Sequence, residues 1–472
     1  MPKLEFLSKD DVEKLHLTSL KILEEIGIKI FDDYSLKLLN QAGAIVDFKQ
    51  NIVKIPEYLL LDLIKKAPAK FKLYSREARY DFEVGDGKPH FSTGNAFYVL
   101  SDGKSQRITA EDLANYIKIA DYLKNIHFCV GTNISDVPQR IWDVYEFEIM
   151  ANNSSKHLRP VIATPDGAKY IIRMAKCICG GEEILRRRPI FSVGYASESP
   201  LRWGTTALQV FRETAKYNIP VNIESETLTG GTSPVTLAGT IVLSNAEVLS
   251  GIFLNQLYQE GRPCVYSIGF THTFDLKTAV ALSGSPEAAL IACIGAQMAR
   301  YYGLPSLSWV CSDSKIPDAQ AAYEKAISFF LHAFSGNDLI WGAGSLEGQL
   351  SFSFEQTLID AEVIDAIMRV MEGVMITDKT LALDIIQRVG IGGTFLKEKH
   401  TLDFYLREHL SPLVTDRSLR GMWEKTGSKD MTKRAKDKLQ EILKTHQPIP
   451  LDHDLSKELR KIVEDAKREL AR

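Results

Sequence analysis

The sequence predicts an α/β protein: a (β/α)8 TIM barrel with an N-terminal mainly helical domain and a C-terminal helical extension. Eight short apolar segments alternate with helical stretches over residues 86–375, and eight such units are typical of this barrel. The apolar segments are nearly continuous, as expected for a parallel sheet that is buried on both faces. An open doubly wound sheet is the alternative, but no GxGxxG motif follows the first strand, so its dinucleotide-binding form is less favoured.

Residues 1–85 are predicted to form the N-terminal domain. Apolar residues recur at helical spacing over 9–27, a segment that ends in glycine, and shorter helices are predicted over 33–43 and 56–66. The segment NIVKIP between the two shorter helices predicts a strand.

The predicted barrel domain covers residues 86–375. Its strands are expected at 90–95, 127–133, 160–165, 189–197, 220–226, 263–270, 305–311 and 338–344. Its helices are expected near 110–123, 142–153, 167–178, 205–217, 235–259, 285–302, 318–335 and 355–373. A hairpin around Asp102-Gly103 is predicted over 97–108, directly after the first strand.

Residues 376–472 are predicted to form the C-terminal helical extension. This part is charged and rich in lysine and glutamate, and the segments DKLQEILKTH and DLSKELRKIVEDAKREL have the periodicity of amphipathic helices. We expect the extension to pack on the barrel or on a partner molecule.

The composition limits the functions that need to be considered. Of 472 residues 45% are hydrophobic and 25% are charged, and the net charge of −3 gives no basic surplus for nucleic acid. No apolar leader follows Met1 and no uninterrupted apolar run reaches about 18 residues, so neither a signal peptide nor a membrane span is expected. We expect a cytoplasmic homo-oligomer whose six cysteines are mostly buried thiols and which has no metal site.

Aromatic residues gather at or just beyond the predicted strand ends, where barrel enzymes bind their substrates. They are Tyr98, Tyr195, Phe270, Trp309 and Trp341. Each of them could be a packing residue. If they converge on one barrel mouth, they form an aromatic box, and the ring faces of such a box attract a quaternary ammonium ion.

Polar candidates follow the fifth and sixth predicted strands. Glu224 and Glu226 alternate and so could point to the same side, as an acid-base pair, as a binding site for a cation or as members of structural ion pairs. His272 is a candidate catalytic residue or a satisfied loop residue. The Gly230-Gly231 step could bring backbone N–H groups close to a ligand, with plain turn geometry as the alternative.

A helix is predicted to begin directly after this glycine step. Thr232 or Ser233 resembles an N-cap and Pro234 would lie in the first turn. The N-terminus of that helix could bind an anion.

Four long segments are distinctive: GGTSPVTLAGTIVLSNAEVLSGI (230–252), THTFDLKTAVALSGSPE (271–287), SDSKIPDAQAAYEK (312–325) and GAGSLEGQLSFSFEQ (342–356). They resemble the trimethylamine methyltransferase family, and the resemblance extends over nearly the whole chain. It implies a barrel enzyme that transfers a methyl group from a methylated amine to the Co(I) of a separate corrinoid protein. The chain itself would hold no tightly bound cobalamin, because its barrel mouth would receive the corrinoid from that partner.

One departure from the family concerns the substrate. Family members that act on trimethylamine carry pyrrolysine at the strand end before the SDxKxPD stretch, whereas this place reads SWVCSDSK here, with Trp309, Val310 and Cys311. The resemblance to the branch without pyrrolysine implies a quaternary amine such as glycine betaine, proline betaine or carnitine. A quaternary amine leaves as a neutral tertiary amine, so the enzyme needs only to desolvate, orient and align it.

In this interpretation the five aromatic residues form the box and Glu224 adds negative potential. His272 or the amides near Gly230 and Gly231 would hold a substrate carboxylate. Three alternatives stay open: a barrel lyase or hydrolase that uses Glu224 and Glu226 as acid and base, a trimethylamine-type homologue without pyrrolysine, and a non-catalytic betaine-binding module.

Overall fold

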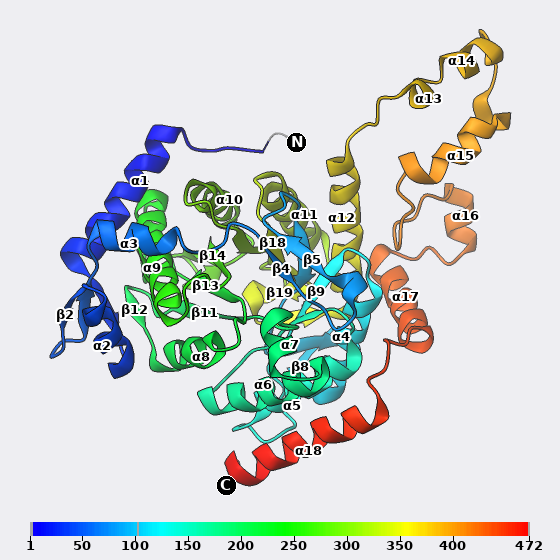
Figure 1. The fold of residues 1–472 in the computed structure, drawn as a ribbon. Helices are drawn as coiled ribbons and strands as arrows, with labels where there is room; N and C mark the ends of the chain where they lie inside the picture. Colours follow the sequence, from blue (N-terminus) through cyan, green and yellow to red (C-terminus); the bar gives the residue numbers. More distant parts are fainter. Residues whose placement is uncertain (1–2, 102, 471–472) are drawn as a thin grey trace.

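The computed structural model describes residues 3–101 and 103–470, and eight parallel strands lie at its centre (Figure 1). They are β6 (His90–Thr93), β9 (Ile126–Val130), β10 (His157–Arg159), β11 (Val193–Ser197), β13 (Val221–Ser225), β14 (Cys264–Gly269), β17 (Ser306–Trp309) and β18 (Leu339–Ala343). Apart from β10 and β11, each strand pairs with the next one along the chain, and β18 pairs with β6. A bridge between Leu158 and Phe191 joins β10 to the segment that leads into β11 and closes the circle. The predicted TIM barrel is confirmed.

Helices follow the strands and surround the barrel (Figure 1). They are α4 (Ala110–Tyr122), α5 (Trp142–Asn153), α6 (Pro165–Cys179), α7 (Glu182–Arg187), α8 (Thr205–Ala215), α9 (Leu237–Tyr258), α10 (Pro286–Tyr301), α11 (Ala319–Phe334) and α12 (Phe354–Glu372). Several begin where a short polar side chain accepts a hydrogen bond from a free N–H of the first turn, as at Thr109, Thr164 and Ser285. Such caps explain why the predicted and observed starts agree closely.

The third strand is a correction to the sequence prediction, because it covers 157–159 and not 160–165. Pro160 has no N–H to give to a strand ladder. The following N–H groups donate to buried carboxylates instead: that of Val161 to Glu146 and that of Ala163 to Asp143. The segment is therefore held as an irregular loop.

The start of α9 is a second correction. The helix begins at Leu237, after the N-cap Thr236, and not at Thr232, Ser233 or Pro234. Residues 228–233 fold into a compact turn in which the N–H groups of Thr232 and Ser233 both donate to Leu228 O. No helix N-terminus therefore lies at the glycine step within the described part of the chain.

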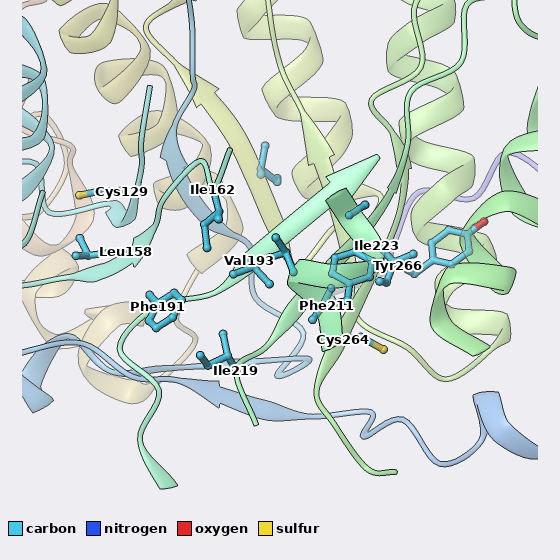
Figure 2. Packing of buried hydrophobic residues seen from close by; sticks show 14 of the residues in the cluster. Cys129, Leu158, Ile162, Phe191, Val193, Phe211, Ile219, Ile223, Cys264 and Tyr266 are labelled. Carbon is cyan, nitrogen blue, oxygen red and sulfur yellow. The ribbon is translucent and has the colours of Figure 1, made fainter. Parts of the chain in front are cut away.

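The apolar core has two layers, because the parallel strands are buried on both faces. The larger layer lies between the strands and the surrounding helices, where Val193 and Ile223 pack with Phe211 of α8 (Figure 2). The smaller layer fills the barrel interior and includes Phe128, Leu307 and Leu339.

A hairpin closes the amino-terminal end of the barrel. Its strands β4 (Phe71–Leu73) and β5 (Phe82–Val84) add apolar side chains to the interior layer. The ring of Phe82 lies 4.5 Å from that of His90, the first residue of β6. The carboxyl end of the strands is therefore left for a binding site.

The N-terminal segment packs on the barrel side. It contains α1 (Lys9–Lys21), a π-helical turn (Ile22–Ile26), β1 (Ile28–Ile30), α2 (Asp33–Gln41), β2 (Ile45–Asp47), β3 (Ile52–Lys54) and α3 (Glu57–Ile64). Its small sheet is extended by β12 (Arg202–Trp203), which pairs with β1. Both α1 and α3 pack against α9.

A second small sheet lies beside the barrel mouth. The predicted hairpin consists of β7 (Tyr98–Ser101) and β8 (Lys104–Arg107), while Asp102 at its tip lies outside the described residues. It pairs through β7 with β20 (Ser351–Ser353), which in turn pairs with β19 (Ser345–Leu346). The loops after β6 and β18 are thus joined.

The C-terminal extension divides into an arm and a strap. The arm carries α13 (Asp378–Leu381), α14 (Leu383–Val389), α15 (Lys399–Glu408) and α16 (Arg420–Lys425) and projects from the body (Figure 1). The strap returns along the barrel, where α17 (Met431–Thr445) packs on α4 and α12, and α18 (His453–Leu470) packs on α5 and α6.

One described helix, α9, has the length and apolar composition of a membrane span. Most of it is buried inside the fold, where it contacts α1, α3, β13 and β14. The helix is therefore accounted for by the core.

Candidate active site

Three of the five predicted aromatic residues meet at the carboxyl end of the barrel. The ring centroid of Phe270 lies 5.1 Å from that of Trp309 and 5.3 Å from that of Trp341, and the two indoles are 6.0 Å apart. We call these three residues the ring cluster. Trp309 and Trp341 lie in the neighbouring strands β17 and β18 and Phe270 directly follows β14, so the barrel itself fixes their spacing.

Strand register explains why the two indoles point inward. Leu307 pairs with Leu339 and Trp309 pairs with Trp341, and all four side chains lie in the interior layer. Phe270 and Trp341 are buried, whereas Trp309 is partly exposed. Neither indole Nε1 has a hydrogen-bond partner among the described residues. Trp309 therefore marks the side from which a ligand would reach the cluster.

The structure does not bring Tyr98 and Tyr195 to this cluster. Tyr195 lies on the outer face of β11, packs edge-on against Phe211 and donates its hydroxyl to Ile162 O. Tyr98 lies on the β7 hairpin, where the guanidinium of Arg107 is 5.5 Å from its ring. Both have packing partners of their own.

Two charged side chains adjoin the ring cluster inside the barrel. Arg159, the last residue of β10, holds its guanidinium 4.8 Å from the ring of Trp341 and its Nη2 3.6 Å from Oε1 of Glu224. Both residues are about 5% exposed. Burial raises the pKa of Glu224 to about 7, with Arg159 lowering it and the charge of Glu226 raising it further.

Gly194 makes room for this charged pair. An added Cβ would lie 2.7 Å from Oε1 of Glu224 and 2.8 Å from Nη2 of Arg159. It would also come within 2.8 Å of Cβ of Asn222. β11 therefore contributes no side-chain atom of its own at Gly194, and the guanidinium and the carboxylate lie in that place.

Glu226 and His272 form a separate pair on the loops above the barrel. Nε2 of His272 lies 2.9 Å from Oε1 of Glu226, and Nδ1 lies 2.9 Å from the hydroxyl of Ser283. The Glu226 side chain is 42% exposed. Glu224 and Glu226 thus do not share a partner: the first faces Arg159 and the second faces His272.

The glycine step forms a surface turn. The N–H of Gly230 donates to Ser233 O and the N–H of Gly231 donates to Leu228 O. Gly230 adopts a φ of 77°, which glycine reaches without strain. Both amides are engaged within the turn, so neither is free to bind an anion in this conformation.

A buried ion pair supports the strand end that carries Trp341. Nζ of Lys325 lies 2.8 Å from Oδ2 of Asp360, and both side chains are fully buried. Lys325 also donates to Gly342 O, while Asp360 accepts from the N–H of Gly344. The pair therefore fixes the turn that directly follows the indole.

Cys311 lies close to the place where the family resemblance puts pyrrolysine. Its thiol is buried, which raises its pKa to about 12, and it accepts a hydrogen bond from the N–H of Gln349. A thiol in these surroundings stays protonated and is a poor nucleophile. Within residues 3–101 and 103–470, no group of three or more metal-ligating side chains is present.

The chain is similar to methyltransferases along its whole length. The sequence model of a family described as trimethylamine methyltransferase (MTTB) matches residues 1–471. A trimethylamine methyltransferase of Methanosarcina barkeri is 38% identical, with 98% of this chain and 95% of the relative covered. A glycine betaine methyltransferase of Desulfitobacterium hafniense is 31% identical, with 100% of this chain and 98% of the relative covered.

A solved structure supports the fold. The monomethylamine methyltransferase of Methanosarcina barkeri aligns with a TM-score of 0.53 at 14% identity. The alignment covers 98% of this chain and 95% of that chain.

Proposed function

The chain belongs to the trimethylamine methyltransferase family, and we propose that it transfers a methyl group from a quaternary amine to the Co(I) of a separate corrinoid protein. The observation that carries this proposal is the ring cluster next to Glu224 at the carboxyl end of the barrel. Aromatic faces and one carboxylate suit a permanently cationic nitrogen, which cannot be recognised by donating a hydrogen bond.

The role of this chain in the transfer is to bind and align. The cobalt of the partner supplies the electron pair that forms the new bond to the methyl carbon. As that bond forms, the C–N bond breaks and its electrons stay on nitrogen, which leaves as a neutral tertiary amine. No proton is needed, so the ring cluster has only to desolvate the ammonium and hold one methyl group toward the mouth.

The rim of the barrel mouth supports docking of a partner protein there. Loops that follow five of the barrel strands carry large apolar side chains that are 48–78% exposed: Phe97, Val235, Leu276, Ile316 and Leu350. Exposed apolar residues that surround one site favour a protein interface. A corrinoid protein bound on this rim would face the ring cluster.

The direct test is a panel of methylated amines mixed with the purified protein and a reduced corrinoid protein, followed by absorbance of the cobalt. We expect methyl transfer from a quaternary amine. Failure with every quaternary amine, together with transfer from trimethylamine, would overturn the proposal. The panel includes trimethylamine, because the relative named for trimethylamine is 38% identical and the one named for glycine betaine is 31% identical.

The lyase or hydrolase alternative loses support from the geometry. It requires Glu224 and Glu226 to act on one substrate as acid and base. Glu224 lies inside the barrel beside Arg159, whereas Glu226 lies on a loop beside His272. Family membership favours methyl transfer over both this alternative and a binding module.

Binding of the quaternary amine should depend on pH through Glu224. Its pKa of about 7 lies above the ordinary carboxyl value because of burial, so the carboxylate is largely protonated below pH 7 and ionised above it. We expect the Kd of the amine to fall up to about tenfold between pH 6 and pH 8, as the ionised fraction rises. Titration calorimetry of the wild type and of Glu224→Gln checks this.

The control for that experiment is His272→Gln, because the imidazole of His272 pairs with Glu226 on the loops above the barrel. The pH dependence should disappear in Glu224→Gln and persist in His272→Gln. The opposite pattern would assign the dependence to the loop pair and not to the carboxylate inside the barrel.

We also propose that the arm binds a second copy of this chain. In the arm, Ile391 is fully exposed and Leu396 and Leu402 are 86% and 79% exposed, and no residue of α13, α14, α15 or α16 is buried. Acidic and basic residues are nearly balanced over residues 374–426, so two copies would meet without net repulsion. Extended apolar surfaces of this kind are typical of permanent homodimer interfaces.

Light scattering with size-exclusion chromatography tests the arm. We expect an oligomer for the wild type and a smaller species for Ile391→Glu combined with Leu396→Glu, because two charges would have to be buried in the interface. Val235→Glu is the control: it places one such charge on the barrel rim, away from the arm, and should leave the oligomer intact. A wild type that is monomeric at micromolar concentration would contradict the proposal.

A further inference from the structure

Arg159 places a buried positive charge beside a site proposed for a positively charged nitrogen. Its guanidinium lies 4.8 Å from the ring of Trp341, on a face that a quaternary ammonium would otherwise use. A bare cation entering the ring cluster would therefore meet like charge. The arrangement requires an explanation beyond the attraction of an ammonium by aromatic rings.

The pair of Arg159 and Glu224 is not a closed structural ion pair. Its 3.6 Å separation exceeds the distance of a charge-assisted hydrogen bond. Nε of Arg159 and Oε1 of Glu224 both lack hydrogen-bond partners within the part of the chain that the structure describes. Among the described residues, Arg159 donates to two acceptors, Pro160 O at 3.1 Å and Gly194 O at 2.9 Å. Donors of a five-donor group thus remain unused.

A structural ion pair in the same barrel looks different. Lys325 and Asp360 are 2.8 Å apart, and both make further hydrogen bonds to the turn after β18. This fold therefore closes and satisfies a buried ion pair whose role is structural. Unpaired buried charges are costly, so they persist where a ligand completes them.

Because Gly194 has no side chain, the guanidinium of Arg159 and the carboxylate of Glu224 fit beside β11. A Cβ there would approach both Nη2 of Arg159 and Oε1 of Glu224 to less than 3.0 Å. The guanidinium and the carboxylate thus occupy the room that a side chain at position 194 would take, and their nearest nitrogen and oxygen atoms remain 3.6 Å apart. Both charges lie on the inner side of the barrel at the level of the ring cluster.

We propose that Arg159 binds the carboxylate of a zwitterionic substrate, so that the site selects betaines over quaternary amines without an acidic group. The ring cluster and Glu224 would hold the ammonium, and the guanidinium would accept the carboxylate through its unused donors. This assignment rests on the proposed function. It replaces His272 and the amides of Gly230 and Gly231, whose polar groups are already engaged.

Charge balance supports this choice. A betaine brings one positive and one negative group and so leaves the net charge of the site unchanged. Choline, which carries the same trimethylammonium group with a hydroxyl in place of the carboxylate, adds an uncompensated positive charge beside Arg159. Inside a barrel of low polarity that difference is not screened by water.

The test compares glycine betaine with choline on the full-length protein by calorimetry. The wild type should bind glycine betaine at least about tenfold more tightly than choline. In Arg159→Gln the affinity for glycine betaine should fall roughly 10- to 100-fold, while that for choline should change less than about threefold or improve. Arg159→Lys, which keeps the charge and loses the planar fork, should lie between the two.

Three outcomes would overturn the proposal: equal losses for both ligands, no loss for glycine betaine, or a wild type that does not distinguish them. If Arg159→Gln fails to fold, Arg159→Lys still tests the guanidinium, and a wild type that does not distinguish the two ligands still overturns the proposal. Failure of the proposed methyl transfer is a separate result, because the binding experiment contains no corrinoid protein. If the affinity for glycine betaine depends on Arg159 but no methyl transfer occurs, the proposed function is wrong. The assignment of Arg159 as the carboxylate-binding residue is then still supported.

Discussion

Replacing Trp309 with leucine should lower kcat/KM for a quaternary amine roughly 30-fold. A desolvated cation on an indole face gains about 2 kcal/mol, and 1.4 kcal/mol corresponds to a tenfold change. Trp309 is the partly exposed member of the ring cluster, 5.1 Å from Phe270 and 6.0 Å from Trp341. Because leucine retains an apolar side chain, the loss reports the ring face more than the buried area. Steady-state methyl transfer to a reduced corrinoid protein measures it.

Two comparisons separate this effect from a general disturbance. Trp309→Phe keeps a ring and should lose less than Trp309→Leu. Tyr195→Phe, at a ring that packs against Phe211 on the outer face, should leave kcat/KM within about threefold. Binding of tert-butylacetate, in which carbon replaces the nitrogen of glycine betaine, should respond weakly to Trp309→Leu. Equal losses for this analogue, which keeps the carboxylate but has no positive charge, would show that ring charge distribution is not what holds the substrate.

The barrel was predictable because its strands and helices differ in period and length, and because the helix starts have capping residues such as Thr109 and Ser285. The sequence did not show which face of each strand points into the barrel. In a parallel sheet with both faces buried, apolar residues occupy both sides, so the sequence carries no alternation that marks the interior. Tyr195 and Trp309 are equivalent by this criterion, yet only Trp309 faces inward.

Arg159 shows a second limit of the sequence. The segment PVIATP is apolar and follows the pattern of a buried strand, which places Arg159 before the strand and far from its carboxyl end. The actual strand is set by partners distant in sequence, since Asp143 and Glu146 take the N–H groups that a strand would need. The one signal available in advance was an arginine directly before the apolar segment PVIATP.

The deviation at the glycine step has a similar cause. A Gly-Gly pair before Thr, Ser and Pro matches the start of a helix, and local propensity offers no reason to delay it. The loop after β14 delays the start of the helix, because the N–H of His272 donates to Thr227 O and the N–H of Thr229 donates to His272 O. These bonds hold residues 227–229 extended, and the helix can begin only after the turn that follows them.

The buried pair of Lys325 and Asp360 should be the most sensitive point of the fold. Lys325→Met leaves the Asp360 carboxylate buried without its cation and removes donors from Gly342 O and Ser345 O. Removing one partner of a buried pair costs about 3–5 kcal/mol, so the free energy of unfolding in urea should fall by that amount. The exposed pair of Lys169 and Asp166 is the control, and Lys169→Met should cost less than about 1 kcal/mol.

The double variant Lys325→Met with Asp360→Leu tests the reason for that loss. If the uncompensated carboxylate causes most of it, the double variant should be more stable than Lys325→Met alone, even though the N–H of Gly344 then also loses its acceptor. Equal or greater instability would assign the loss to the turn itself. Gly342 and Gly344 adopt φ values of 119° and 90° in that turn, directly after Trp341, so a turn that relaxes should also raise KM for the amine. A stable double variant with a raised KM would therefore separate the ion pair's contribution to folding from its contribution to the position of the indole.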